Sequence, residues 1–237
     1  MLASRNPAVR LAGEPTLPAF RAVVMDMDGL ALDTEATYCD AWRAAAAALG
    51  FPLSEPFCHG LFGRHADDVH AALAEACGEG FDLKRFFKLA EDFWHVHVRT
   101  KGVAKMPALD RFVSLLRQRE LPYALATNSD APYAREVLEQ AGARELFPIV
   151  VTRDEVAQGK PAPDLFLEGA RRLGADPAEC LGLEDSLVGL QACQRAGLIP
   201  VLIPSRAASA SRPPDGTWVL PSLGALADCI ERSGDAS

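Results

Sequence analysis

Short apolar runs recur along the chain, and polar residues follow each of them. Runs of this length are typical of strands that are buried on both faces of a parallel sheet. The runs cover residues 20–25, 123–126, 149–151, 180–183 and 199–203. The pattern therefore predicts strands that belong to one sheet.

The segments between these runs carry helical patterns. One segment has apolar residues at positions i, i+3, i+4 and i+7, which form a single face of a helix. The residues of this face are Leu109, Phe112, Val113 and Leu116. Ser129 or Asp130 can cap another helix, and Ser186 can cap a third. Because strands alternate with helices, we expect βαβ units and the α/β class, with a Rossmann-like parallel sheet as the core.

Residues 35–103 break this alternation. They contain the alanine run 44–48 and apolar positions with helical spacing, but no convincing strand. We therefore expect a helical insert directly after the loop that follows the first strand. The predicted organisation is an N-terminal tail over 1–19, an α/β core over 20–34 and 104–230, and an inserted helical domain over 35–103.

Composition narrows the function classes. The formal net charge of −8 and the pI near 5.2 disfavour a nucleic-acid or membrane surface as the partner. No apolar run is long enough to predict a membrane span. The six cysteines lack zinc-type spacing, which predicts reduced thiols and a cytoplasmic protein. His95 and His97 have no further ligands close in sequence, which argues against a zinc site there.

Polar side chains come after the apolar runs, where the predicted strands end. In an open parallel sheet such residues gather at the carboxyl edge, where ligands bind. Carboxylates that cluster in this way normally need a cation, and their oxygens suit Mg²⁺, which also binds substrate phosphate. The residues are Asp26, Asp28, Thr127, Asn128, Lys160, Glu184 and Asp185.

Each of these segments alone has a simpler interpretation. Asp26 and Asp28 can be solvated turn residues after a strand. Residues 127–130 and 184–186 can be ordinary helix caps. Lys160, beside prolines, can be an exposed loop charge. Their shared order, each at or after the end of a strand, favours one common site over separate explanations.

The order and spacing of the segments resemble those of the haloacid dehalogenase superfamily. Residues 26–34, DMDGLALDT, resemble its first motif, DxDGxxxDT, and residues 127–129 resemble its second. Lys160 in the sequence GKPAPD resembles the third motif, and residues 184–186 resemble the fourth. The resemblance covers about residues 20–225. The helical insert resembles the small α-helical cap of the branch that contains β-phosphoglucomutase and phosphoglycolate phosphatase.

The resemblance implies catalytic roles. Asp26 would be the nucleophile that forms an aspartyl-phosphate. Asp28 would protonate the leaving oxygen and then accept a proton from the attacking water. Thr127 and Lys160 would hold the phosphoryl oxygens, and Asn128 would help to bind the substrate.

The resemblance also implies Mg²⁺ as the cofactor. Asp26, the backbone carbonyl of Asp28 and Asp185 would bind it. Glu184 would bind it directly or through a water molecule.

The second aspartate of the first motif separates the chemistries of the superfamily. Dehalogenases and phosphonate-cleaving members lack it, so Asp28 disfavours both reactions. A phosphatase and a β-phosphoglucomutase-type phosphotransferase remain. β-Phosphoglucomutases carry a cap arginine where this chain has Ala66, which favours hydrolysis. Arg64 and His65 are the candidates for contacting the substrate from the cap.

The sequence therefore predicts a monomeric Mg²⁺-dependent phosphohydrolase that acts on a small phosphorylated metabolite, such as a sugar phosphate or phosphoglycolate. A non-catalytic binding or regulatory protein on the same fold is the alternative from another class. Such a protein should have lost Asp26, Asp28, Lys160 or Asp185, and all of them are present.

Overall fold

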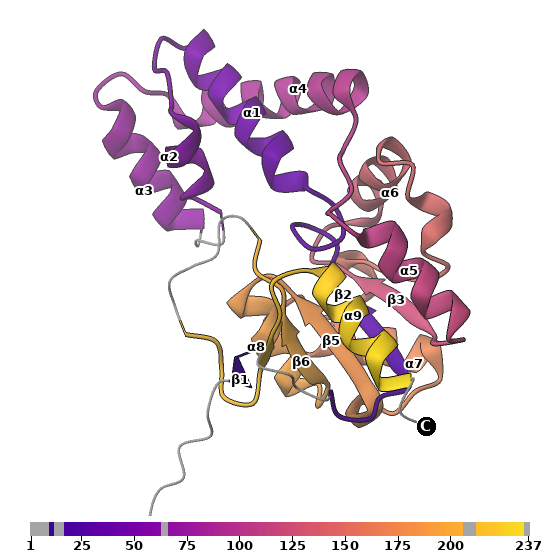
Figure 1. Cartoon of the computed structure of the whole chain (residues 1–237). Coiled ribbons are helices and arrows are strands. Elements are labelled where there is room, and N and C mark those ends of the chain that lie inside the picture. The colour runs from indigo at the N-terminus through magenta and orange to yellow at the C-terminus, as the bar shows by residue number, and fades with distance from the viewer. Residues whose placement is uncertain (1–9, 12–16, 63–65, 206–211, 235–237) are drawn as a thin grey trace, which may run out of the picture.

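A parallel sheet forms the core of the protein (Figure 1). The computed structural model describes residues 10–11, 17–62, 66–205 and 212–234. Within them, seven strands are ordered β1-β7-β6-β5-β2-β3-β4, and every pairing is parallel. The strands are β1 (Arg10–Leu11), β2 (Ala22–Met25), β3 (Tyr123–Ala126), β4 (Val150–Val151), β5 (Cys180–Glu184), β6 (Ile199–Leu202) and β7 (Trp218–Val219). The predicted α/β class is confirmed.

The predicted strands are all present, as β2 to β6. The hydrophobic pattern does not predict β1 and β7, because two residues are too few to show a period. These two strands pair with each other at one edge of the sheet. Residues 10–11 thus belong to the sheet, although the sequence places them in an N-terminal tail.

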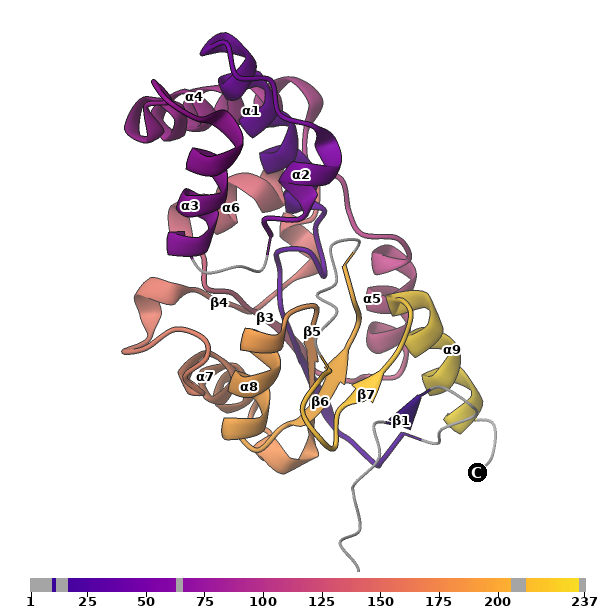
Figure 2. The same ribbon diagram turned by 90° about the vertical axis from the view of Figure 1, so that its left-hand side faces the viewer.

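Helices cover both faces of the sheet, with α5 and α9 on one side and α7 and α8 on the other (Figure 2). Side chains alternate along β2, so Val23 and Met25 pack in the cluster that includes α5, α6 and α9. Ala22 and Val24 pack with α7 and α8. These helices are α5 (Leu109–Gln118), α6 (Ala131–Gln140), α7 (Asp164–Leu173), α8 (Leu187–Arg195) and α9 (Leu223–Gly234). Short 3₁₀ helices lie at Arg144–Leu146, Arg153–Glu155 and Pro177–Glu179.

The ends of these helices follow the signals in the sequence. The predicted apolar face of α5 is buried. Asp130, rather than Ser129, caps α6, because its Oδ1 accepts a hydrogen bond from the Tyr133 amide at 3.0 Å. Ser186 caps α8, as predicted, by accepting a hydrogen bond from the Gly189 amide at 3.1 Å. The Ser129 side chain is left free for the site described below.

A helical segment is inserted between β2 and α5, as predicted. It comprises α1 (Thr34–Ala48), α2 (Glu55–His59), α3 (Ala66–Cys77) and α4 (Leu83–Lys101), which we call the cap. The cap has a hydrophobic cluster of its own that includes Leu61, Leu73 and Phe86, all buried. Asp33 caps α1 and Asp82 caps α4 through their side chains. In Figure 1 the cap lies above the sheet.

Two chain segments join the cap to the core and pair with each other. Leu32 and Lys105 form an antiparallel bridge, and the Asp33 amide donates to the Ala104 carbonyl at 2.8 Å. Trp94 of α4 belongs to the larger core cluster rather than to the cap cluster. The cap is therefore packed against the core as well as tethered to it. Among the described residues, no helix combines the length and apolarity needed to cross a membrane.

Candidate active site

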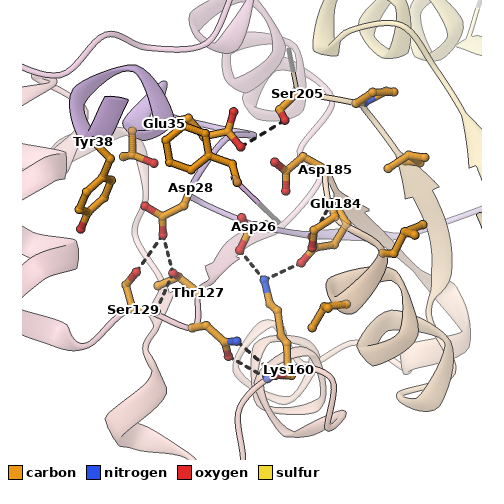
Figure 3. Close-up of a pocket in the computed structure, with 18 of the residues that line it drawn as sticks. Asp26, Asp28, Glu35, Tyr38, Thr127, Ser129, Lys160, Glu184, Asp185 and Ser205 are labelled. Atoms are coloured by element: carbon orange, nitrogen blue, oxygen red, sulfur yellow. Dashed lines mark hydrogen bonds and ion pairs between the residues drawn. The ribbon is translucent and has the colours of Figure 1, made fainter. Parts of the chain in front are cut away.

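The centre of the site is a lysine between two carboxylates. β2 lies between β5 and β3, so Asp26 stands at the middle of the carboxyl edge of the sheet. The Lys160 Nζ donates to Asp26 Oδ1 and, at 2.6 Å, to Glu184 Oε1 (Figure 3). All three side chains are less than 10% exposed. The Lys160 Nζ also lies 5.0 Å from the centre of the Phe166 ring, which forms one wall around it.

Burial and charge shift the proton affinities of this group in opposite directions. Burial raises the pKa of Asp26 to about 7, although the neighbouring Lys160 lowers it. Burial lowers the pKa of Lys160, but the attraction of Asp26 and Glu184 outweighs burial, so the pKa rises and the ammonium form is kept. Burial and the charge of Asp26 raise the pKa of Asp185 well above its usual value. Full ionisation of Asp26, Glu184 and Asp185 would therefore place more negative charge here than Lys160 alone can balance.

Asp28 lies beside this group and is held by hydroxyl groups. Thr127 Oγ1 donates to Asp28 Oδ2 at 3.0 Å, and Ser129 Oγ donates to the same oxygen at 2.9 Å. Tyr133 donates its hydroxyl to Asp28 Oδ1 at 3.1 Å. These donors come from the loop after β3 and from the first turn of α6. The Asp28 side chain is therefore turned away from the other carboxylates (Figure 3).

Three acidic residues can hold a cation together. One oxygen of each of Asp26, Glu184 and Asp185 lies within 4.8 Å of the others. Glu184 Oε1 is bound by Lys160, and its Oε2 accepts a hydrogen bond from Ser186 Oγ at 2.9 Å. No described residue donates a hydrogen bond to the Asp185 carboxylate. All the ligand atoms offered here are carboxylate oxygens, and those of Asp185 are free of hydrogen bonds from the described residues. Such a set of oxygens fits a hard divalent cation.

Glycines make room for these carboxylates. Gly29 has a φ of +79°, and a Cβ there would lie 2.3 Å from Asp185 Oδ2. A Cβ on Gly189 would lie 1.8 Å from the carboxyl carbon of Glu184. In the sequence Gly29 stands out only as part of a motif, and Gly189 carries no signal of its own because it lies within a helix.

The loop that carries Lys160 is fixed by the residue after Thr127. Asn128 Oδ1 accepts a hydrogen bond from the Lys160 amide at 2.8 Å, and its Nδ2 donates to the Lys160 carbonyl at 3.2 Å. Asn128 also lines the pocket, so its predicted contact with substrate stays a prediction. A Cβ on Gly159 would lie 2.5 Å from Asn128 Oδ1, which explains a glycine before Lys160.

A cavity of about 500 Å³ opens above these residues, between the core and the cap. The core supplies its charged floor, and the cap supplies Glu35, Tyr38 and Phe62. Ser205, after β6, donates to Glu35 Oε1 at 3.4 Å across the cavity. The predicted cap residues Arg64 and His65 lie outside the described residues.

The structure thus brings together the core residues that the sequence predicts for the site. Those residues are Asp26, Asp28, Thr127, Asn128, Lys160, Glu184 and Asp185. The cavity is also lined by residues that the sequence does not predict for the site, among them Tyr133, Glu35, Tyr38 and Ser205. For Tyr133 a signal exists, since it lies in the first turn of a helix that begins at the carboxyl edge. Ser205 gives no signal, because its approach to Glu35 depends on the path of the chain after β6.

The chain is similar in sequence to known hydrolases. A model of the haloacid dehalogenase-like hydrolase family matches residues 20–197. Fructose-1-phosphate phosphatase YqaB of Escherichia coli is 31% identical over 179 residues, which are 76% of this chain and 94% of that protein. A bifunctional riboflavin kinase/FMN phosphatase of Arabidopsis thaliana is 40% identical over 104 residues, 44% of this chain but only 27% of the plant protein.

A solved structure extends the similarity to three dimensions. It is a haloacid dehalogenase family hydrolase from Deinococcus radiodurans with bound phosphate and sodium. It is 26% identical, has a TM-score of 0.75, and the match covers 91% of this chain and 96% of that one.

The chain belongs to the haloacid dehalogenase-like hydrolase family. Protein CbbY of Rhodobacter capsulatus is 31% identical over 87% of this chain. The inserted helical cap and this similarity assign the chain to the CbbY-like branch, whose small helical cap the helical insert predicts. Within that branch it is an enzyme of the phosphatase class, a phosphoric monoester hydrolase.

Proposed function

We propose that this enzyme is a Mg²⁺-dependent phosphatase of small sugar phosphates or similar phosphate monoesters, and that it works through an aspartyl-phosphate on Asp26. The observation that carries the proposal is the arrangement of Asp26 between Lys160 and the open carboxylate of Asp185, with Asp28 held separately by hydroxyl donors. This arrangement offers a nucleophile, a cation site and an acid–base group around one point.

Each residue would have one task in the reaction. An oxygen of Asp26 attacks phosphorus, and the bond from phosphorus to the leaving oxygen breaks. Asp28 gives a proton to that oxygen and then takes one from the water that hydrolyses the intermediate. Lys160 binds a phosphoryl oxygen whose charge grows in the transition state. The predicted contact of Thr127 with the phosphoryl group stays a prediction, because its hydroxyl donates to Asp28 Oδ2 in this structure. Both protons and the phosphoryl group are then accounted for, and Asp26 is regenerated.

Mg²⁺ would supply a positive charge that binds a phosphoryl oxygen and lowers the repulsion between Asp26 and the phosphate. Asp26 and Asp185 would hold it directly, and the backbone carbonyl of Asp28 stays a predicted ligand. Glu184 would bind the cation through a water molecule rather than directly, because Lys160 and Ser186 already bind its two oxygens.

The proposed substrate class rests on the cavity and on the relatives. A cavity of about 500 Å³ is large enough for a phosphate and a small sugar but not for a macromolecule. Its outer wall mixes the Tyr38 and Phe62 rings with the Glu35 and Ser205 oxygens, which suits a leaving group that has both carbon faces and hydroxyl groups. The E. coli relative is named for a sugar phosphate of this size.

The test compares the wild-type enzyme with Asp26→Asn on a panel of esters, in Mg²⁺ or in EDTA. The panel holds fructose 1-phosphate, glycerol 3-phosphate, phosphoglycolate, FMN and β-glucose 1-phosphate. We expect phosphate release that needs Mg²⁺ and falls at least about 10³-fold in Asp26→Asn. Glu79→Gln, which removes an exposed carboxylate of the cap, is the matched control.

Other outcomes would contradict the proposal. Phosphate release that persists in Asp26→Asn would exclude Asp26 as the nucleophile. Glucose 6-phosphate formed from β-glucose 1-phosphate with little free phosphate would identify a mutase. An absence of turnover on any ester, with Mg²⁺ still bound, would favour a binding protein.

A further inference from the structure

Tyr133 connects the proposed acid–base residue to the cap. Its hydroxyl donates to Asp28 Oδ1 at 3.1 Å, and its side chain projects from the first turn of α6 in the core. Thr127 and Ser129, the other donors to Asp28, both bind Oδ2. Tyr133 is therefore the one described residue that fixes the Oδ1 oxygen.

The Tyr133 ring is seated on two aromatic residues of the cap. It stacks on Trp94 of α4 with ring centres 5.2 Å apart and on Tyr38 of α1 with centres 6.3 Å apart. Tyr38 and Trp94 also stack on each other, with centres 5.5 Å apart. Trp94 is fixed in turn, because its Nε1 donates to Thr37 Oγ1 at 3.0 Å. The place of the Tyr133 ring thus depends on two helices of the cap, α1 and α4.

The chemistry of Asp28 explains why one oxygen needs a separate donor. With Oδ2 occupied by two hydroxyl groups, Oδ1 is the oxygen that can exchange a proton with the leaving group. A single donor leaves Oδ1 a free lone pair while it restricts rotation of the carboxyl group. Burial raises the pKa of the Tyr133 hydroxyl well above its usual value, so this group keeps its proton and stays a donor.

We propose that Tyr133 is a positioning residue, which turns Asp28 Oδ1 toward the leaving oxygen and whose own place is set by the stack with Tyr38 and Trp94. The inference rests on the proposed acid–base role of Asp28. It makes proton transfer by Asp28 dependent on how the cap is seated on the core. A cap that is displaced would move the stack, and Asp28 Oδ1 would lose its donor.

The test compares Tyr133→Phe with wild type on two kinds of ester. An alkyl ester such as fructose 1-phosphate or glycerol 3-phosphate, whichever is turned over, needs a proton on its leaving oxygen. p-Nitrophenyl phosphate does not, because nitrophenolate leaves unprotonated. The ratio kcat/KM covers the steps up to departure of the leaving group. We expect kcat/KM to fall about 10- to 100-fold for the alkyl ester and less than about 2-fold for p-nitrophenyl phosphate.

Two further variants make the test specific. Tyr123→Phe is the matched control, because the Tyr123 hydroxyl bonds the Leu146 carbonyl at 2.7 Å, far from the site, and both esters should be unaffected. Trp94→Phe keeps an aromatic ring in the stack but loses the bond to Thr37. It should lower kcat/KM for the alkyl ester selectively, by less than Tyr133→Phe does.

The outcomes separate this inference from the proposed function. An equal loss on both esters in Tyr133→Phe would mean a general structural role and would overturn the inference. Unchanged alkyl-ester turnover in Tyr133→Phe, with turnover abolished in Asp28→Asn, would also overturn it while leaving the proposed function intact. If Asp28→Asn spares the alkyl ester, the proposed acid–base role itself fails.

Discussion

At the scale of single residues, the pocket carries an excess of negative charge. Among the described residues that line it, Lys160 is the basic residue and five are acidic. The acidic residues are Asp26, Asp28, Glu35, Glu184 and Asp185. Burial raises the pKa values of Asp26 and Asp185, which means that the folded protein opposes their ionisation. Without a bound cation, the ionised form of Asp26 is therefore destabilised by burial and by the neighbouring carboxylates.

This charge excess predicts how stability depends on pH. Burial raises the pKa of Asp26 from its ordinary value of 3.8 to about 7 in the folded protein, so the folded state binds this proton more tightly than the unfolded state. The stabilisation is complete below about pH 4 and is lost as the pH rises toward about 7. Without metal, we expect the free energy of unfolding to fall by about 2 kcal/mol between pH 5 and pH 8. Urea unfolding in EDTA at several pH values measures this.

Asp26→Asn and added Mg²⁺ provide the controls. Asp26→Asn should flatten the pH profile, because the asparagine never ionises. Glu79→Gln, at an exposed site, should keep the wild-type profile. Mg²⁺ should restore stability at pH 8 in wild type more than in Asp26→Asn. A wild-type profile that rises between pH 5 and pH 8 in EDTA would contradict this account.

The same residues show what the sequence can predict about a site. Asp26, Glu184 and Asp185 end their strands or follow them directly, so strand prediction alone gathers them at one edge. Tyr133 carries a partial signal, because it lies in the first turn of a helix that begins at this edge. Glu35 reaches the pocket through the angle of α1, which no local pattern encodes. The hydrogen bond from Ser129 to Asp28 is not predictable either. From the sequence alone, the Ser129 hydroxyl could equally well cap the following helix.

At the scale of elements, the Glu184 carboxylate packs so closely against α8 that position 189 of this helix must be glycine. Gly189 lies in the first turn of this helix, where alanine ordinarily stabilises a protein by about 0.5–1 kcal/mol. Here a Cβ would lie 1.8–2.1 Å from the carboxyl atoms of Glu184, a side chain that is 1% exposed and bound to Lys160. Glu184 cannot move without leaving the Lys160 ammonium with one partner.

We therefore expect Gly189→Ala to destabilise the protein, by about 1–3 kcal/mol, and to lower kcat/KM at least about tenfold. Thermal unfolding and steady-state kinetics measure both effects. Gly224→Ala in α9 is the matched control, because its nearest neighbours would lie at 3.4 and 3.5 Å, ordinary contact distances. Gly224→Ala should leave activity unchanged. Wild-type activity in Gly189→Ala would show that the position of Glu184 matters little.

Elements differ in how far the sequence determines them. β2 and β5 are buried along their whole length, and their unbroken apolar runs predict them. β1 and β7 have two residues each and form only because they find each other at the edge of the sheet, across more than two hundred residues of chain. Long-range pairing of this kind leaves no local signal.

At the scale of the whole molecule, the cap has a hydrophobic cluster of its own, although its residues Ala41, Trp94 and Val98 belong to the larger core cluster. The cap cluster is formed by α1 to α4 and the segments between them, whereas both core clusters contain strands of the sheet. The two bodies meet at the paired linkers around Leu32 and Lys105 and at the stack of Tyr38, Trp94 and Tyr133. The cavity lies between them, so loss of order in the cap should affect substrate selection before it affects the sheet.

Leu73→Ala tests this division, because Leu73 is fully buried in the cap cluster. We expect a local destabilisation of about 2–4 kcal/mol, which hydrogen exchange should show as faster exchange in α1, α3 and the first half of α4. β2, β3 and β5 should exchange as in wild type, and Mg²⁺ should still bind. In the matched variant Leu116→Ala, the cavity lies in the core cluster, so exchange should rise across the sheet. If Leu73→Ala accelerated exchange in β2 as much as in α3, cap and core would unfold as one unit. The cap would then not move independently of the core, and Tyr133 could not link a change in cap position to Asp28.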